Sequence, residues 1–302
     1  MPDANLRTWA SNNFPGCISG SFIDETHPGV LAATNLNISG SGNVTNLMGM
    51  QAFSNALYLD VSNNPITTWM GPASLRHLSA YNCGITGTFT VPYMLTMVNV
   101  AYNNITTLDL SNADQLLYVT AHHNQITSVI WPSNPPLTNV DLSYNQLSGF
   151  GTNYYLPYIQ SLTISHNQFT AVPYGWNNLT YLDASWNQIT DLSQLHGSNY
   201  NFSVNLSHNP IQYVPGLSNA ESVDLSFNPL TQGIAETGYN LETLRVSDTQ
   251  LPCLPYLHNA LVNLYCTNSP IGCLPNQPAD LVMSATNFGF TPALCPAGDP
   301  CH

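Results

Sequence analysis

Apolar and polar residues follow a fixed order that recurs along most of the chain. Residues 137–147, LTNVDLSYNQL, show the unit most clearly: it is apolar at the first, fourth, sixth and eleventh places and has asparagine at the ninth. Apolar residues at the fourth and sixth places, separated by a polar one, predict a short strand that buries one face. Recurrence about every 20 residues predicts a stack of similar units.

The fourth-place residues define thirteen units at intervals of 17 to 23 residues. They are Leu36, Leu59, Leu78, Val98, Val119, Val140, Leu162, Leu182, Val204, Val223, Leu244, Leu264 and Leu281. The order L-x-x-L-x-L-x-x-N-x-L is the signature of a leucine-rich repeat, which predicts a right-handed, curved solenoid with a parallel β-sheet on its concave face. Because the turns are short, we expect extended or 3-10 segments on the convex side and little helix.

The first 30 residues do not fit the repeat. Leu6, Trp9 and Phe14 lie near helical spacing behind Asp3, which predicts a short helix within an N-terminal cap over 1–30. A cap is needed because the first turn of a solenoid would otherwise expose its apolar face. We expect the repeats to occupy 31–290 and a C-terminal tail or cap to occupy 291–302.

Asparagine recurs at the ninth place of the repeats. The row is Asn64, Asn103, Asn124, Asn145, Asn167, Asn187, Asn209 and Asn228. A turn that leaves a strand buries backbone groups, and a carboxamide has the donors and the acceptor to satisfy them, so we interpret this row as structural. Several asparagines, such as Asn37 and Asn205, also match N-x-S/T, a pattern that repeat composition produces readily.

Rings and carboxylates recur at the outward positions of the predicted strands. The eighth place carries Tyr102, His123, Tyr144, His166, Trp186, His208 and Phe227; the third adds Tyr118 and Tyr181; the fifth adds Asp141, Asp183 and Asp224. Such a track suits an extended glycan or a peptide, because rings stack on apolar surfaces while fixed polar groups select orientation. Alternatively, the rings stack on one another from turn to turn and shield the asparagine row.

A second polar row follows the eleventh place. It consists of Thr67, Thr86, Thr106, Thr127, Ser148, Thr170 and Thr190. A regular ladder of hydroxyl groups on a nearly uncharged surface suggests ice binding. The row is only one residue wide, however, and Ser or Thr is an ordinary residue at such a bend.

The seven cysteines are concentrated towards the C-terminus. Cys253 and Cys273 occupy equivalent places in successive repeats, which predicts a disulfide between neighbouring turns. Cys295 and Cys301 flank a short Pro/Gly loop, and a disulfide there would close the end of the solenoid. We expect Cys83 and Cys266 to be buried free thiols.

Charge excludes one class of function. The chain has three basic residues, all arginine, against 16 acidic ones, and its net charge is −13. Nucleic-acid binding requires a dense basic patch, so we expect no nucleic-acid partner. No segment is long and apolar enough to cross a bilayer, so we expect no membrane insertion, and the first residues do not form a signal peptide.

Catalytic and metal-binding patterns are missing from the sequence. There is no H-E-x-x-H, no G-x-S-x-G and no phosphate-binding loop. His122 and His123 are adjacent, so we expect their side chains to point to opposite faces of a strand end. We therefore predict a non-catalytic protein without a metal ion or cofactor.

The two ends of the chain and its short repeats suggest a family. The opening PDANLRTW with PGCISGSFIDETHPGVLAATNLNISGSG, and the closing LPCLPYLHNALVNLYCTNSPIGCLPNQPADLV, resemble secreted leucine-rich-repeat proteins of Bacteroidota, related in architecture to internalins. The resemblance implies export and a C-terminal sorting domain. This sequence contains no such domain, so we interpret it as a trimmed ectodomain.

Three functions stay open. The first is a secreted or cell-surface binding solenoid that recognises a glycan or a protein through the concave rings and aspartates. The second is a structural adhesin or filament subunit that associates with copies of itself. The third is an ice-binding protein that uses the threonine row.

Overall fold

A computed structural model describes residues 1–67, 69–133, 135–151, 154–175, 178–193, 195, 202–217 and 219–298. The chain divides into two compact units, and each is described by itself. Unit 1 consists of Met1–Gln146 with Gly151–Tyr154, and unit 2 of Leu147–Phe150 with Tyr155–His302. Cys301, one of the predicted disulfide partners, lies outside the described residues.

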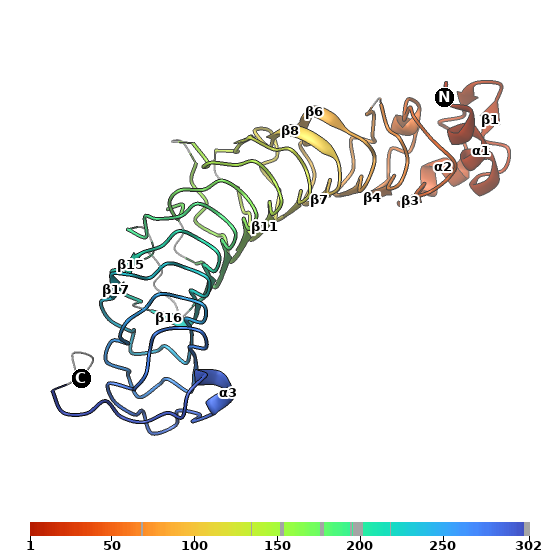
Figure 1. The fold of residues 1–302 in the computed structure, drawn as a ribbon. Helices are drawn as coiled ribbons and strands as arrows, with labels where there is room; N and C mark the ends of the chain where they lie inside the picture. The colour runs from red at the N-terminus through yellow and green to blue at the C-terminus, as the bar shows by residue number, and fades with distance from the viewer. Residues whose placement is uncertain are drawn as a thin grey trace. The chain divides into compact units, whose positions relative to one another are not determined.

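Unit 1 begins with helix α1, Ala4–Asn13, which starts after Asp3 (Figure 1). One carboxylate oxygen of Asp3 accepts hydrogen bonds from the N–H groups of Asn5 and Leu6, as a helix N-cap does. The indole of Trp9 donates to the carbonyl of Asn37 at 2.7 Å. The helix therefore packs on the first strand of the main sheet.

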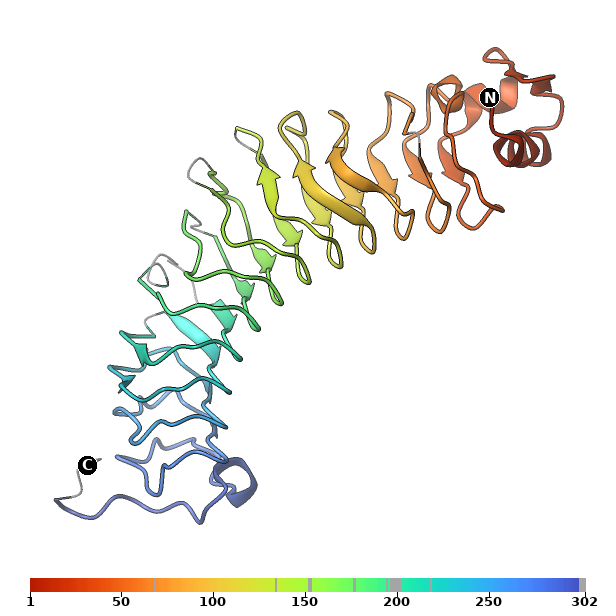
Figure 2. The same cartoon turned by 45° about the horizontal axis from the view of Figure 1, so that its top comes forward.

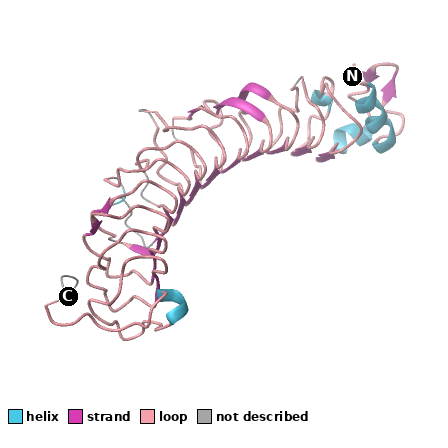
Figure 3. Cartoon of the chain, viewed as in Figure 1, coloured by secondary structure: helices cyan, strands magenta, loops and turns pink. Residues whose placement is uncertain are grey.

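Three short elements accompany this helix. They are strands β1, Ile18–Ser19, and β2, Phe22–Ile23, which pair antiparallel, and helix α2, Pro28–Ala32. In Figure 3 the N-terminal helices lie together at the start of the chain, ahead of the repeated turns.

The main sheet of unit 1 is parallel. Its strands are β3, Asn35–Asn37; β4, Tyr58–Asp60; β5, His77–Ser79; β7, Met97–Asn99; β9, Tyr118–Thr120; and β11, Asn139–Asp141. Each strand pairs with the next in an unshifted register. Equivalent places of neighbouring repeats therefore lie side by side, as the successive turns in Figure 2 show.

Unit 2 contains a parallel main sheet of the same kind. Its strands are β12, Ser161–Thr163; β13, Tyr181–Asp183; β14, Phe202–Asn205; β16, Ala220–Asp224; β18, Thr243–Arg245; and β19, Asn263–Tyr265. The last helix, α3, spans Ala285–Phe288, and the carbonyl of Asn287 accepts a hydrogen bond from the N–H of Cys266 just after β19.

The side of the turns opposite the main sheets is extended. In unit 1 it forms the parallel strands β6, Thr86–Thr90; β8, Asn104–Asp109; and β10, Ser128–Ile130, preceded by the 3-10 helix η1, Met50–Ala52; in unit 2 it forms β15, Tyr213–Val214, and β17, Gly233–Ile234. The prediction of extended and 3-10 segments with little helix is confirmed, because turns of about 20 residues are too short for helices.

The apolar places of the repeat form the core. Twelve of the thirteen fourth-place residues lie in strands of the main sheets, and Leu281 is buried outside them. The sixth-place residues, from Val61 to Cys266, are buried, and so are those of the eleventh place except Ile85. Each unit is therefore a parallel β-solenoid, and the predicted fold class is confirmed.

The cysteine pairings differ from those predicted. Cys273 bonds to Cys295, with their Cα atoms 4.9 Å apart, so the predicted pairs Cys253–Cys273 and Cys295–Cys301 are both wrong. The reason is backbone pairing: the N–H of Cys295 donates to the carbonyl of Leu274 at 2.8 Å, which places the tail beside the last turn. Cys253 is also disulfide-bonded.

The free cysteines of the described chain are Cys17, Cys83 and Cys266, and all three are buried. Burial raises the pKa of the Cys266 thiol to about 12. The prediction that Cys83 and Cys266 are buried free thiols is confirmed. None of the helices in the described residues is long and apolar enough to cross a membrane.

Candidate ligand-binding face

The eighth place of the repeat has an uncommon backbone conformation. In eleven turns its φ lies between 51° and 60°, in the left-handed region. The residues are Asn63, Asn82, Tyr102, His123, Tyr144, His166, Trp186, His208, Phe227, Asp248 and Asn268. Asparagine and aspartate tolerate this region best among residues with a side chain, and they occupy the outermost of these turns.

Seven of these turns place a ring where the backbone favours asparagine. The left-handed conformation costs such a residue on the order of 1 kcal/mol. The rings of Tyr102, Tyr144, Trp186 and Phe227 are nevertheless 43%, 45%, 50% and 49% exposed. Neither backbone preference nor complete burial therefore explains the choice of residue.

In unit 1 three of these rings form a stack. The ring centroids of Tyr102 and His123 are 4.2 Å apart with an interplanar angle of 8°, and those of His123 and Tyr144 are 4.2 Å apart at 18°. Tyr81 extends the row, with its ring tilted by 58° against Tyr102. We call Tyr102, His123 and Tyr144 the unit 1 ladder.

Four rings form a second stack in unit 2. Centroid distances are 5.1 Å from His166 to Trp186, 3.8 Å from Trp186 to His208 and 4.2 Å from His208 to Phe227, with interplanar angles of 10°, 15° and 8°. We call these four residues the unit 2 ladder. The stacking that we considered as an alternative is therefore present in both units.

Stacking determines which part of each ring a ligand can reach. Rings inside a ladder have both faces covered by their neighbours, so they present their edges to solvent. The edge of an aromatic ring is positive relative to its face, and edge contacts with carbonyl groups and other rings are favourable. The ladders therefore offer a continuous strip of ring edges rather than separate platforms for sugar rings.

The sequence predicted that the side chains of His122 and His123 point to opposite faces of a strand end. This prediction is wrong. Their Nδ1 atoms are 2.9 Å apart and their ring centroids 5.1 Å apart. The reason is the φ of 53° at His123, which turns its side chain away from the alternation of a regular strand. Since one Nδ1 must accept while the other donates, at least one ring of the pair is neutral.

His166 is partly buried at the start of the unit 2 ladder. Burial lowers its pKa, the nearby Asp183 carboxylate opposes this shift, and His208 adds to it. The neutral form of His166 is therefore favoured in the folded chain.

The fifth-place aspartates have a local structural role that the sequence analysis missed. The Oδ1 of Asp141 accepts hydrogen bonds from the N–H and hydroxyl of Ser143, at 3.0 and 2.7 Å. Asp183 accepts the same two bonds from Ser185, and the N–H of Ser226 donates to Asp224. These Asx turns hold the strand end that leads to the left-handed residue. The recurring pattern Asp-x-Ser was the signal for them.

Two of the N-x-S/T matches form the same turn. The Oδ1 of Asn205 accepts from the N–H and hydroxyl of Ser207, at 3.1 and 2.8 Å, and Asn37 makes the equivalent bonds with Ser39. Turn geometry is thus enough to account for these two sequence matches.

The ninth-place asparagines connect neighbouring turns. The Nδ2 of Asn187 donates to the carbonyls of Ile164, Ala184 and Ser185 at 3.0, 3.1 and 3.1 Å, and its Oδ1 accepts from the N–H of Phe169 at 3.0 Å. The other seven members form closely similar bonds to their own turn and to adjacent turns. Each side chain therefore satisfies several backbone groups at once.

The remaining predicted residues lie beside the ladders or away from them. Tyr118 and Tyr181 lie in β9 and β13, and are 41% and 42% exposed. In the threonine row, the hydroxyl of Thr67 donates to the carbonyl of Thr45 at 3.1 Å, and that of Thr127 to Thr106 at 3.3 Å. These two hydroxyls bond to the preceding turn, as expected of a residue at a structural bend.

Arg245 was not singled out from the sequence. Its guanidinium lies 4.7 Å from the centre of the Tyr265 ring, and the two residues are register partners in β18 and β19. Arg7 and Arg76, in contrast, donate to backbone carbonyls. The single positive charge on the outward face of unit 2 thus stacks on an aromatic ring. No group of three or more metal-ligating side chains occurs within the described residues.

Comparison with known proteins places the fold in a class. A family model described as "Leucine Rich repeat" matches residues 177–192. The repeats, the parallel sheets and this match define a leucine-rich-repeat solenoid. Among curated proteins, none matches the chain significantly.

Solved structures extend this likeness over most of the chain. YopM from Yersinia enterocolitica is 22% identical, with a TM-score of 0.66, over 91% of this chain and 66% of that one. The leucine-rich-repeat domain of APL1B is 16% identical, with a TM-score of 0.62, over 74% and 71%. TLR13 in a complex with ssRNA13 is 18% identical, with a TM-score of 0.57, over 85% and 44%. At these identities the likeness concerns the fold alone.

Proposed function

We propose that this chain is an extracellular, non-catalytic recognition protein that binds a protein ligand on the outward face of its main sheets. The observation that carries the proposal is the placement of rings, four of them exposed, at seven left-handed positions where the backbone favours asparagine. Tyrosine, tryptophan and arginine are also the residues that most often dominate binding energy at protein interfaces.

The geometry of the ladders favours a protein over a glycan. A sugar binds an aromatic side chain through the ring face, whereas the ladder rings cover one another at 3.8 to 5.1 Å. A strip of ring edges beside carboxylates and hydroxyls suits the mixed polar and apolar surface of a protein. Leucine-rich-repeat solenoids of this kind commonly mediate protein binding.

Disulfide bonding supports an extracellular location. The disulfide Cys273–Cys295 and the bonded Cys253 are typical of an oxidising compartment. With no lysine and a net charge of −13, the chain also has no basic surface for nucleic acid. We therefore propose a protein partner, although one solenoid of similar fold was solved with RNA.

An array experiment tests the proposal. The wild-type chain and two variants, Tyr144→Asn and Trp186→Asn, are applied to immobilised extracellular proteins and, in parallel, to a glycan array. Asparagine is chosen because it occupies the same left-handed place in three other turns. We expect some of the immobilised proteins to bind the wild-type chain and to fail to bind one of the two variants. Ring-dependent binding to glycans alone, or no ring-dependent ligand, would contradict the proposal.

A further inference from the structure

In unit 2, the backbone hydrogen bonds that join the tenth place of one turn to the eleventh place of the turn before stop at Pro210. In successive turns the tenth-place N–H donates to the eleventh-place carbonyl of the turn before: Gln168 to Leu147 at 2.8 Å and Gln188 to Phe169 at 2.9 Å. The next turn has Pro210 at the tenth place. Proline has no N–H, so this hydrogen bond is not made.

The backbone hydrogen bonds between these two turns do not resume beyond the proline. Within the described part of the chain, no backbone hydrogen bond joins 190–192 to 210–215. Each segment is instead bonded to its other neighbour: the N–H of Thr190 donates to Thr170 at 3.0 Å, and that of Gln232 donates to Gln212 at 2.9 Å. The two turns therefore separate at this point.

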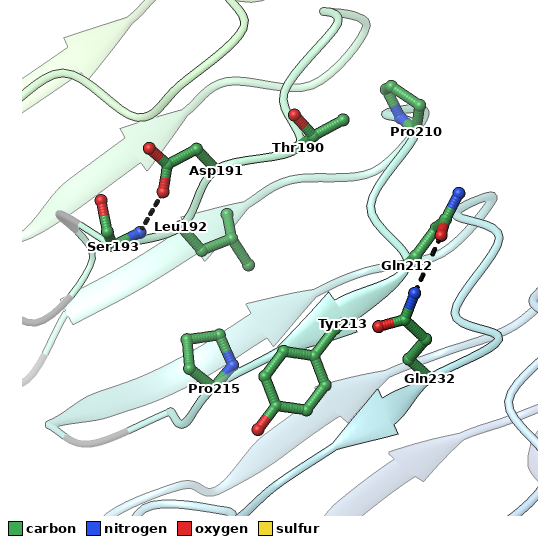
Figure 4. Close-up of a pocket in the computed structure, with 9 residues that line it drawn as sticks. All are labelled: Thr190, Asp191, Leu192, Ser193, Pro210, Gln212, Tyr213, Pro215 and Gln232. Atoms are coloured by element: carbon green, nitrogen blue, oxygen red, sulfur yellow. Dashed lines mark hydrogen bonds between the residues drawn. The ribbon is translucent and has the colours of Figure 1, made fainter.

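A hollow of about 560 Å³ opens between the separated turns. Leu192 approaches it from one wall, and Tyr213 and Pro215 approach it from the other (Figure 4). Tyr213 is 44% exposed, and Asp191 is the charged residue of the lining. The volume falls within the range of about 300–1,000 Å³ that is usual for ligand sites.

The walls of the hollow are strand edges. β15 pairs with β17 through two carbonyl groups. The carbonyl of Val214 accepts a hydrogen bond from the N–H of Ala235, and that of Gln212 accepts one from the N–H of Gln232. Because alternate residues of a strand direct their N–H and C=O groups to opposite edges, those of Tyr213 face the hollow. Across from it, Asp191 pairs with Ala171, so the N–H of Leu192 is turned towards the hollow by the same alternation.

We propose that this hollow binds an extended peptide, which adds as a strand to the free edge of β15 and places a lysine or arginine side chain beside Asp191. Unpaired strand edges recruit extended segments through main-chain hydrogen bonds, and side pockets then select residues. Here Leu192, Tyr213 and Pro215 provide the apolar walls, and the carboxylate selects charge.

The state of Asp191 agrees with a cationic side chain. Its Oδ1 accepts the N–H of Ser193 at 2.8 Å, and this bonding lowers the pKa of the carboxyl group. The group is therefore ionised at neutral pH. The hollow is separate from the ladders, so this site does not depend on the function proposed above.

Binding of synthetic peptides tests the proposal. The probes are seven-residue, fluorescein-labelled peptides in which valine and threonine alternate around one lysine, measured with the full chain by fluorescence anisotropy. The matched probe carries N-methyl groups on alternate backbone nitrogens, which removes the hydrogen-bond donors of one edge. We expect the unmethylated peptides to bind, and the methylated ones to bind at least about tenfold more weakly.

Three variants at the hollow and one control variant outside it locate the site. Tyr213→Pro removes the edge N–H without touching the pairing to β17, and we expect a loss of at least about tenfold; Tyr213→Ala keeps the N–H, and we expect a smaller loss. Asp191→Asn weakens the binding of the lysine peptides, but it does not weaken the binding of peptides that carry norleucine in place of the lysine. Trp186→Asn, in the unit 2 ladder, leaves peptide binding unchanged.

Two results would overturn the proposal. One is that no peptide of the set binds the wild-type chain at concentrations up to about 1 mM. The other is that the methylated peptides bind as well as the unmethylated ones; this comparison uses only the wild-type chain, so it stands even where Tyr213→Pro does not fold.

Discussion

At the scale of single residues, the eighth place of the repeat brings two requirements into conflict. Its backbone is left-handed, which asparagine accommodates at Asn63, Asn82 and Asn268. The seven inner turns carry rings instead, at a conformational cost on the order of 1 kcal/mol each. Ring stacking contributes about 0.5–1.5 kcal/mol per pair, which is enough to offset that cost. It does not explain why Tyr102, Tyr144, Trp186 and Phe227 stay 43–50% exposed.

The lowered pKa of His166 predicts a pH dependence of stability. Between the folded pKa and the unfolded value of about 6.5, the unfolded chain binds more protons, so stability falls as the pH falls through this window. His166→Phe keeps a ring in the ladder and removes the titration. We expect the difference in urea midpoint between pH 7.5 and 5.5 to be smaller in the variant than in the wild type. An equal difference would contradict the assignment.

At the scale of elements, side-chain amides and one disulfide connect neighbouring turns. Parallel strands of three residues provide few main-chain bonds of their own, so each turn relies on its asparagine and on the apolar columns. At the C-terminal end, the pairing of Leu274 with Leu294 and the bond between Cys273 and Cys295 attach the tail.

The asparagine row predicts a large effect of a small substitution. Asn187→Ala leaves the buried N–H of Phe169 without its acceptor, and it removes one of two donors from the carbonyls of Ile164, Ala184 and Ser185. Because an unsatisfied buried group costs about 1–3 kcal/mol, we expect a loss of about 2 kcal/mol in the free energy of unfolding. Urea denaturation measures it. Gln188→Ala, at the neighbouring exposed position, is the control and should change the free energy by less than about 0.5 kcal/mol.

The C-terminal disulfide predicts a second effect. Cys273 and Cys295 are 22 residues apart in the sequence. Closing a loop of this length stabilises a fold by about 3 kcal/mol in the chain-entropy model. We expect the double variant Cys273→Ser, Cys295→Ser to lose that amount of unfolding free energy in urea denaturation. The control is Cys266→Ser, which replaces a buried free thiol and leaves the disulfide intact. An unchanged midpoint in the double variant would show that the tail does not stabilise the last turn.

At the scale of the whole molecule, the repeat made the fold predictable. From the second turn to the twelfth, the fourth and sixth places are buried in every turn and the eleventh in every turn but that of Ile85, so the places of Val140 and Leu142 define the core of each unit. The disulfide pairing was not predictable in this way, because Cys295 lies beyond the repeats, where periodicity carries no information. The convergence of His122 and His123 depends on a φ of 53°, which ring residues seldom adopt.

The candidate site was predictable as a set of residues but not as a geometry. Register alone brings the rings of one column together, as Tyr102 and His123 show. Whether their faces or their edges meet solvent depends on side-chain rotation about a left-handed backbone, which the sequence does not specify. The hollow beside Tyr213 depends on hydrogen bonds that are missing at Pro210. A proline at this place does not by itself predict a hollow, because Pro229 occupies the same place in the next turn without a comparable gap before Gln232.

The measurement that tests the account most directly is the affinity of a protein ligand from the array for Trp186→Asn, determined by surface plasmon resonance. The control is Tyr239→Asn, which changes an 81% exposed ring outside the ladders. Loss of a central interface tryptophan costs about 2 kcal/mol or more, so the account predicts at least about a 30-fold weaker dissociation constant for Trp186→Asn and an unchanged one for Tyr239→Asn. Equal affinities of the wild type and Trp186→Asn would contradict it.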